Sequence, residues 1–297
     1  MLKHTSVMLE EVIRLIKPEI GGFYIDATIG LGGHTSQILP LIGKSGKVLC
    51  IDQNINSLKE AEKNLNKFEN QCIFVNDNFS NILKIAKANY FNNINGIIYD
   101  LGLASWQIDT SSLGITFSRN EPLDMRLQTS EDKTRKGKFS LTAAEVINRF
   151  PVKKLAEILY QYGDVHNSWS VARRIDVARR SRSINTTFDL IAAIGTRSPK
   201  ILAPIFQALR IYVNHELENL QNSLEQSLDL LAVGGRIVVI SFHSGEDRIV
   251  KNIFRNREKT NKDIKILTKK PIVPNIKEIK RNSRSRSAKL RAIEKIR

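Results

Sequence analysis

The sequence is poor in the residues that build disulfide scaffolds, metal sites and membrane spans. Among 297 residues only Cys50 and Cys72 are cysteines. Both stand in apolar, strand-like contexts without the spacing of metal ligands, so no metal is predicted and the thiols are interpreted as buried in a reducing, cytoplasmic protein. No apolar run approaches the ~20 residues that a membrane span requires. The first residues also lack the pattern of a secretory or transit peptide.

Acidic residues are scarce as well, since 46 Lys and Arg face 30 Asp and Glu and give a net charge of +16. From Arg248 to Arg297 there are 18 Lys and Arg against 4 Asp and Glu, so nearly all of the excess lies there. Such a concentration predicts a polyanionic partner, most simply nucleic acid. The alternative is a solvated basic tail. Interleaved Leu, Ile and Pro favour a segment that folds.

What the sequence does contain is a strand that breaks into a glycine-rich turn. Residues 23–28 alternate apolar and polar types and are rich in β-branched and aromatic residues, and residues 30–34 read Gly-Leu-Gly-Gly-His before an expected helix. A second apolar stretch, 47–52, ends in Asp52, at about the spacing from the glycines at which an acid accepts hydrogen bonds from ribose. This pattern predicts the nucleotide-binding turn of a doubly wound α/β sheet.

The glycine pattern differs from that of dinucleotide sites, because Thr35 stands where the third glycine of Gly-x-Gly-x-x-Gly would be. This opposes an NAD-linked oxidoreductase and favours a nucleoside without a pyrophosphate. S-adenosylmethionine, which has ribose and adenine but no phosphate, fits. A purely structural turn is the alternative, and the glycines with Asp52 do not by themselves choose the cofactor.

The regular alternation of strands and helices is interrupted once. Strands are expected at 71–75 and 94–100, residues 101–140 have no clear period, and residues 141–194 are helical in pattern. A long amphipathic helix over 206–231 and an apolar strand over 236–242 then resume the series. The sequence therefore predicts a Rossmann-like methyltransferase domain formed by residues 1–106 and 207–297, interrupted by a mostly helical substrate-recognition domain formed by residues 107–206.

Two further features have a functional and a structural interpretation. Phe79 follows the third strand, where it would pack on a purine, or else join the core. Five arginines repeat along one stretch of the helical insertion and form either a phosphate-binding face or a solvated one. They are Arg173, Arg174, Arg179, Arg180 and Arg182.

Asp100 ends the fourth strand, beside the expected cofactor. The lone pair of a cytosine or adenine amine is delocalised into the ring, so acceptors on its N–H groups and a base that removes a proton would assist methylation. Asp100 or Asp124 could supply this, with Gln107 as a further acceptor. Methylation at C5 of a pyrimidine needs a cysteine nucleophile, and Cys50 and Cys72 are badly placed for it.

Motifs over nearly the whole chain resemble those of one family. They are His4–Leu9, Tyr24–Thr28, Gly32–His34, Asp100–Gly102, Pro122–Arg126, Phe206–Asn214, Ser241–Ser244 and Arg281–Arg291. With these stretches the chain resembles the bacterial small-subunit ribosomal RNA (cytosine-N4)-methyltransferases, the MraW or RsmH family.

The resemblance implies methyl transfer from S-adenosyl-L-methionine to N4 of a cytidine in the decoding region of 16S rRNA. It also implies contacts from a set of cofactor-binding residues. These are Gly32, Gly33, His34, Asp52, Phe79, Asp100 and Gln107. Asp100, Asp124 and His243 are the predicted catalytic residues, although His243 could be structural and Arg126 could hold a phosphate or pair with Asp124. The expected partner is rRNA, either naked or in an assembled subunit, and association as a homodimer is left open.

The sequence departs from the usual family pattern at Gly245 (usually Leu), Ile115 (usually Phe) and Gln128 (usually Asp). Ala104 and Trp106 also replace a usual Ser and Pro. None of these changes removes an expected cofactor contact, but they leave the shape of the RNA-facing loop open. A non-catalytic RNA-binding protein with a cofactor fold is the alternative function.

Overall fold

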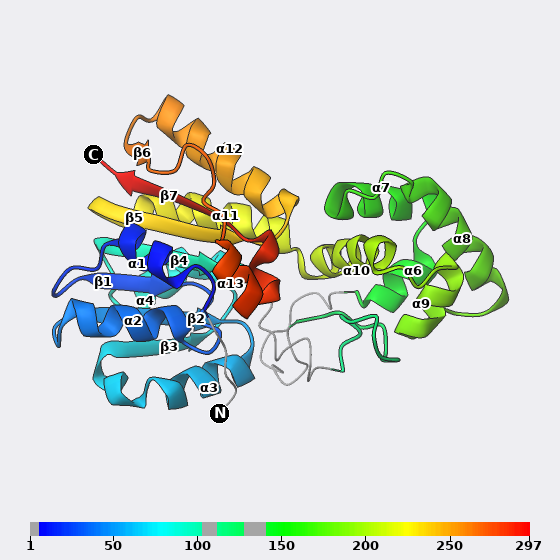
Figure 1. Ribbon diagram of the computed structural model, residues 1–297, viewed down its shortest axis with the longest axis horizontal. Helices are drawn as coiled ribbons and strands as arrows, with labels where there is room; N and C mark the ends of the chain where they lie inside the picture. The colour runs from blue at the N-terminus through cyan, green and yellow to red at the C-terminus, as the bar shows by residue number, and fades with distance from the viewer. Residues whose placement is uncertain (1–5, 103–111, 128–140) are drawn as a thin grey trace. The chain divides into compact units, whose positions relative to one another are not determined.

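The computed structural model describes residues 6–102, 112–127 and 141–297 (Figure 1). The chain divides into two compact units. The first combines Met1–Leu103 with Leu217–Arg297, and the second is Ala104–Glu216. No helix in the described ranges is long and apolar enough to cross a membrane.

The first unit is built on a seven-stranded sheet in the order β3-β2-β1-β4-β5-β7-β6. The strands are β1 (Phe23–Asp26), β2 (Lys47–Asp52), β3 (Cys72–Asn76), β4 (Ile94–Asp100), β5 (Leu231–Ser241), β6 (Ile264–Ile266) and β7 (Lys289–Lys295). The first five in spatial order are parallel, and β7 runs antiparallel between β5 and β6. The order of the strands reverses at β1 and β4, which is the switch point where α/β sheets bind ligands. The predicted Rossmann-like α/β fold is confirmed.

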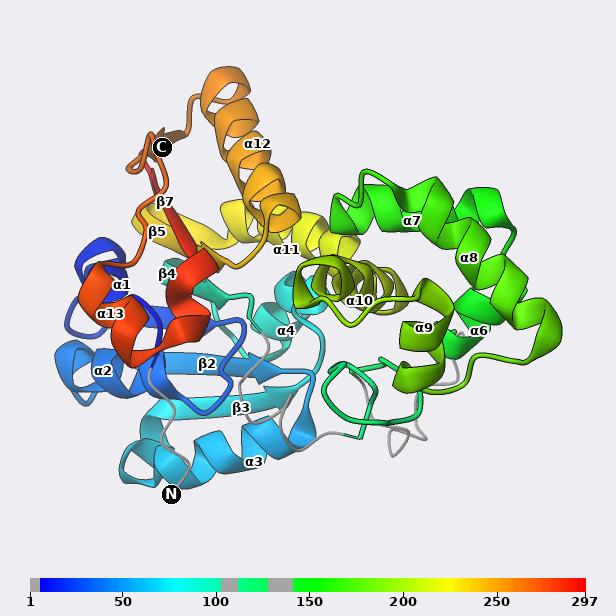
Figure 2. The ribbon, with the colours of Figure 1, turned by 45° about the vertical axis from the view of Figure 1, so that its right-hand side comes forward.

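Helices cover both faces of this sheet (Figure 2). One face packs on α1 (Leu9–Ile16), α2 (Gly33–Ile42) and α3 (Ile55–Asn64), and the other on α4 (Ile82–Ala88), α11 (Glu216–Leu230) and α12 (Ser244–Thr260). The remaining elements are α13 (Ile276–Arg281) and the 3-10 turns η1 (Asn66–Gln71), η2 (Phe79–Asn81) and η3 (Ser283–Ser287). Because the central strands are buried on both faces, their sequences are continuous apolar runs.

The second unit is helical. It contains α6 (Ala143–Arg149), α7 (Val152–Gly163), α8 (Ser168–Ser181), α9 (Thr187–Ile194) and α10 (Pro199–Asn214), packed around one apolar core. Two of the helices begin with a capping box, in which an N-terminal threonine and an acid three residues later exchange hydrogen bonds with the backbone. These local signals agree with the helical pattern expected over 141–194.

The single helix expected over 206–231 is wrong. The backbone of His215 is left-handed, with φ of 52°, and separates α10 from α11. Leu209 and Val213 of α10 pack in the core of the second unit, whereas Leu220 and Leu224 of α11 pack on the sheet. The two helices therefore serve different cores, and the boundary between the units follows α10 instead of falling within it at 206/207.

Candidate active site

The acids that end three strands lie at one edge of the sheet. Asp26 is the last residue of β1, Asp52 of β2 and Asp100 of β4, and β1 pairs with both of the other strands. Because these strands are parallel, their carboxyl ends meet at the same edge. The structure thus brings together two predicted site residues, Asp52 and Asp100, with a third acid that the sequence analysis did not assign.

The glycine turn after β1 is attached to this edge by its backbone. The N–H of Gly30 donates to Oδ2 of Asp52 at 3.0 Å. Gly30 and Gly32 have φ of 53° and 82°, in the left-handed region that glycine adopts without a steric penalty. A Cβ on Gly32 would also come within 2.9 Å of Leu65 Cδ1. The turn leads directly into α2, whose first N–H groups have no acceptor within the helix and can serve a ligand.

Residues 6–8, here called the N-terminal strap, cross the beginning of α2. A Cβ on Gly33 would lie 1.9 Å from Oγ of Ser6, so only glycine permits this close approach. Nε2 of His34 lies 3.0 Å from the carbonyl oxygen of Val7. Since a carbonyl only accepts, Nε2 carries the hydrogen. The next residue, Met8, donates its backbone N–H to Oε1 of Glu278 at 2.6 Å.

Asp52 combines two backbone hydrogen bonds with burial. Its Oδ1 accepts from the N–H of Asn54 at 2.8 Å, and its Oδ2 accepts from Gly30. Burial raises the pKa of Asp52 from 3.8 to about 7, against the opposing effect of these two bonds. A carboxylate has about four acceptor positions. Two further donors can therefore be accepted, which matches the two hydroxyls of a ribose.

Asp26 is the functional candidate that the sequence analysis missed. It is buried, and its Oδ2 accepts from Oγ1 of Thr35 at 2.7 Å while its Oδ1 accepts from the N–H of Thr28 at 3.3 Å. Burial raises the pKa of Asp26, and the Thr35 hydroxyl opposes that rise. The available signal was a carboxylate at the end of an otherwise apolar strand. Thr35, which breaks the dinucleotide pattern, thus has a defined contact.

Asp100 lies between the glycine turn and His34. Its backbone N–H donates to Oγ1 of Thr28 at 2.7 Å, which ties the end of β4 to the segment after β1. Its Oδ2 lies 3.8 Å from Nδ1 of His34, and the two side chains are 18% and 6% exposed. With the hydrogen of the neutral imidazole on Nε2, Nδ1 presents a lone pair to this carboxyl group. The two form an ion pair only when His34 is protonated.

Phe79 is half-buried after β3. Its ring packs edge-to-face on Tyr99, with 5.9 Å between the ring centroids, and joins the core on that side of the sheet. Its carbonyl oxygen accepts from Oγ of Ser223 at 2.8 Å, which fixes the backbone. Of the two alternative interpretations, the packing of Phe79 in the core is present, and the residue as a whole is half-buried.

Both cysteines are structural in their surroundings. Cys72 is the first residue of β3, at the opposite edge from the acids, and the Cys50 side chain is fully buried in the core. Burial raises the pKa of the Cys50 thiol well above its ordinary value, which disfavours the nucleophilic thiolate.

His243 begins α12 as its N-cap. Its Nδ1 accepts from the backbone N–H of Glu246 at 3.4 Å, and Oε2 of Glu246 accepts from the N–H groups of His243 and Phe242. Nε2 of His243 is 3.2 Å from Oε1 of Glu246. This reciprocal cap gives His243 a structural role. Gly245, where the family usually has Leu, is next to this cap, because a Cβ on it would lie 3.1 Å from Nδ1 of His243.

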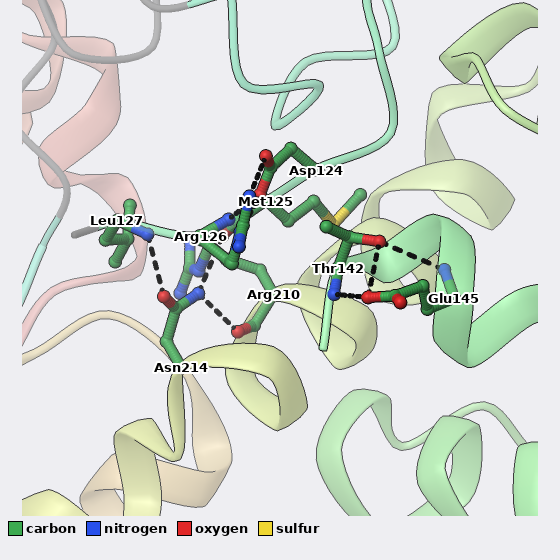
Figure 3. A network of polar contacts seen from close by, with 8 residues as sticks. All are labelled: Asp124, Met125, Arg126, Leu127, Thr142, Glu145, Arg210 and Asn214. Atoms are coloured by element: carbon green, nitrogen blue, oxygen red, sulfur yellow. Dashed lines mark hydrogen bonds and ion pairs between the residues drawn. The ribbon is translucent and has the colours of Figure 1, made fainter. Parts of the chain in front are cut away.

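Asp124 belongs to the second unit, where it pairs with Arg126 (Figure 3). Oδ1 of Asp124 accepts from Nε of Arg126 at 2.6 Å and Oδ2 accepts from Nη2 at 2.7 Å. The hydrogen bond raises the pKa of the Arg126 guanidinium. The side chain of Asn214 bonds the backbone on both sides of Arg126, accepting from the N–H of Leu127 and donating to the carbonyl of Met125. Arg126 was expected either to hold a phosphate or to pair with Asp124, and the structure shows the pair with Asp124.

Part of the positive charge of the five arginines is paired within the unit. Arg179 and Arg180 both pair with Asp176, at 2.8 and 2.7 Å, and Arg182 lies 3.9 Å from Asp189. Arg174 donates to the carbonyl of Ile194. Arg173 and Arg174 also line a cavity of about 710 Å³ between α8 and α9. The cationic face expected from the sequence is therefore smaller than five free arginines would make it.

Several predicted features lie outside the described residues. They are Gln107, Gln128, Ala104, Trp106 and the first two residues of the His4–Leu9 motif. Ile115 is described and is half-buried.

The reversal of strand order, the glycine turn and the acid that ends β2 define a Rossmann-like protein with a site for a nucleoside. The glycines and the half-buried Asp52 fit the ribose and adenine of S-adenosylmethionine without requiring a phosphate group. The chain belongs to the MraW methylase family, whose model matches residues 1–296. It is therefore a methyltransferase.

Curated relatives match over nearly their full length. The chain is 39% identical over 316 residues to ribosomal RNA small subunit methyltransferase H of Mycoplasma mycoides, with 99% of each protein covered. The protein of the same name from Mycoplasma capricolum is 37% identical over 316 residues, again with 99% of each covered. That from Mesoplasma florum is 39% identical over 318 residues, with 99% of this chain and all of the relative covered.

Proposed function

We propose that this protein transfers a methyl group from S-adenosyl-L-methionine to the exocyclic N4 amine of a cytidine in small-subunit rRNA, in the cytoplasm. The observation that carries the proposal is that the glycine turn after β1 and Asp100 lie at the same edge of the sheet. Support for the RNA substrate comes from the names of the full-length relatives and from the family motifs.

The cofactor would be held by the residues of the β1 and β2 ends. Asp52 would accept the ribose hydroxyls, the N–H groups at the start of α2 would bind polar atoms of the ligand, and the exposed part of Phe79 would pack on adenine. Gly32 and Gly33 let Leu65 and Ser6 pack closely against the turn, and His34 positions the strap. When bound, S-adenosylmethionine supplies a methyl group already activated by a sulfonium.

Asp100 is the best-supported residue for the target amine. A carboxylate there would accept a hydrogen bond from an N–H of the cytosine amine, which localises the nitrogen lone pair, and it would take the proton that the amine loses on methylation. Nδ1 of His34, at 3.8 Å, faces the same carboxyl group. Asp124 and His243 are weaker candidates, because an ion pair with Arg126 and a helix cap already account for them.

The cytosine would have to leave its base stack to reach this edge. The second unit, residues 104–216, would then serve substrate recognition. Whether the substrate is naked rRNA or an assembled subunit, and whether the protein acts as a homodimer, would be tested with each RNA form and by light scattering.

The test is methyl transfer from labelled S-adenosylmethionine to small subunits that lack base methylation, followed by digestion to nucleosides. We expect N4-methylcytidine with the native protein and at least a hundredfold less with Asp100→Asn, because the amide cannot take the proton. An unchanged melting temperature of the variant controls for folding, because Asp100 is itself an expected cofactor contact. Label at another base atom would refute the amine mechanism. Cofactor binding without any transfer would favour the non-catalytic RNA-binding alternative.

A further inference from the structure

The segment from Ile276 to Ser287, here called the basic segment, concentrates exposed positive charge. It contains five exposed cations and a single acid, Glu278. The cations are Lys277, Lys280, Arg281, Arg284 and Arg286. Within the described parts of the chain, no ion pair joins Lys280, Arg281 or Arg286 to an acid, whereas Arg179 and Arg180 of α8 are paired with Asp176. The charges of Lys280, Arg281 and Arg286 are thus available to an anionic partner.

This segment is folded, so its cations are held in place before a partner binds. The side chain of Asn275 caps α13 by accepting from the N–H of Glu278 at 2.9 Å. Asn282 accepts from the N–H of Arg284 and opens η3, and Ser285 is fully buried, with its Oγ donating to the carbonyl of Asn282 at 2.7 Å. The buried serine fixes the turn while Arg284 and Arg286 on either side stay exposed. A phosphate-binding surface needs this preorganisation if cations are to bind without a large loss of entropy.

The sheet register places the basic segment at the edge that carries Asp100. Asp100 pairs with Ile240 of β5, and Ile240 pairs with Leu290 of β7. Because β7 is antiparallel, its first residues lie at the carboxyl edge of the parallel strands, and the basic segment immediately precedes them. The strap reaches the same place, since Met8 donates to Glu278 of α13 (Figures 1 and 2). The exposed cations therefore belong to a segment that lies at the same edge of the sheet as Asp100.

We infer that the basic segment binds the phosphates of the RNA that flanks the target nucleotide. The inference rests on the proposed function for the identity of the RNA, but the charge and its location stand independently. A phosphate backbone presents anions at regular intervals to exposed Lys and Arg, and such contacts position the nucleic acid without reading its sequence. An acidic protein surface is the other polyanion, and the experiment distinguishes it.

The experiment compares two variants with the same change in charge. The test variant is Lys280→Gln, Arg281→Gln and Arg286→Gln. The control variant is Lys259→Gln, Lys262→Gln and Lys265→Gln, exposed cations near β6, whose register with the end of β7 places them toward the opposite edge. Binding to a fluorescent RNA oligonucleotide of the small-subunit decoding region is measured over a roughly tenfold range of salt concentration, from about 0.05 to about 0.5 M. S-adenosylhomocysteine binding and methyl transfer are measured beside it.

The plot of the logarithm of the association constant against the logarithm of salt concentration has a negative slope. In the test variant we expect this slope to become shallower by about 2 to 3, and Kd near physiological salt to rise on the order of 50-fold. KM for the RNA substrate should rise while S-adenosylhomocysteine binding is unchanged. The control variant should behave like the native protein. Equal salt slopes in the test and control variants would overturn the inference. It would also be overturned if the test variant retained its affinity for RNA but lost affinity for an acidic protein. Absence of methyl transfer by the native protein would count against the proposed function alone, because the binding assay does not depend on it.

Discussion

The raised pKa of Asp52 predicts that cofactor affinity depends on pH near neutrality. Burial raises this pKa from 3.8 to about 7, so keeping the carboxylate ionised in the folded protein costs roughly 4 kcal/mol relative to an ordinary aspartate. Ribose hydroxyls donate hydrogen bonds and favour the ionised form. Binding should therefore release the proton of Asp52.

The size of the effect follows from the fraction of Asp52 that is ionised. With a pKa of about 7, this fraction is about one-eleventh at pH 6 and about ten-elevenths at pH 8, so Kd for S-adenosylhomocysteine should be about tenfold larger at pH 6, or about 1.4 kcal/mol. Above pH 8 the affinity should reach a plateau. In the protein without ligand, the contribution of Asp52 to the free energy of unfolding changes with pH in the opposite direction to the cofactor affinity. Between about pH 4 and 7 the folded state holds a proton that the unfolded state has released, so this group's contribution to stability falls as pH rises.

Isothermal titration calorimetry in buffers of different ionisation enthalpy measures both Kd and the protons released. About half a proton should be released at pH 7 and almost none above pH 8.5. Asp52→Asn should bind at least tenfold more weakly and should lose most of the pH dependence, while it keeps Asp26 and Asp100 as internal controls. A native Kd that does not change between pH 6 and 8, or an unchanged pH profile in the variant, would refute the assignment of Asp52 to the ribose.

Three further predictions concern the surroundings of the site. Gly33→Ala should weaken S-adenosylhomocysteine binding at least tenfold because its Cβ would collide with Ser6, and adding Ser6→Gly should restore most of the affinity; no rescue would mean that the strap is not the cause. Thr35→Val should lower the free energy of unfolding in urea by about 1–3 kcal/mol, more at high pH because the lost hydrogen bond favours ionised Asp26, whereas Thr35→Ser should be nearly neutral. His243→Asn should retain methyl transfer because asparagine also caps helices; a loss of kcat in a variant with unchanged melting temperature would identify His243 as catalytic.

The strand, the glycine turn and the spacing to Asp52 were readable because each depends on residues close together in the sequence. A buried strand, a turn and a helix start have local patterns, and parallel strands place their last residues at one edge. The pairing of Asp176 with Arg179 and Arg180 was also readable in principle, since spacings of three and four residues are neighbours on a helix. The expectation of a basic face took no account of it.

Other parts of the site depend on contacts that have no local signal. The bond from Met8 to Glu278 joins residues 270 positions apart, and the direction of His34 follows from the position of Val7. The left-handed residue His215 divides a continuous helical pattern because α10 and α11 pack in different cores, which an amphipathic period alone does not reveal. Asp26 belongs to the Tyr24–Thr28 motif, but only its burial and its hydrogen bond from Thr35 distinguish it from other strand residues.

The position of β7 has a consequence for how the protein is made. This strand lies between β5 and β6 but is translated after both, and the basic segment that precedes it touches a strap from the beginning of the chain. Until residue 295 has left the ribosome, β5 and β6 lack their common neighbour, and until residue 278 has emerged the strap lacks its acceptor. A ribosome-bound nascent chain thus forms the cofactor turn early and completes the adjoining edge late. The edge beside β5 therefore forms only after the strap, β5 and β6 have all been synthesised.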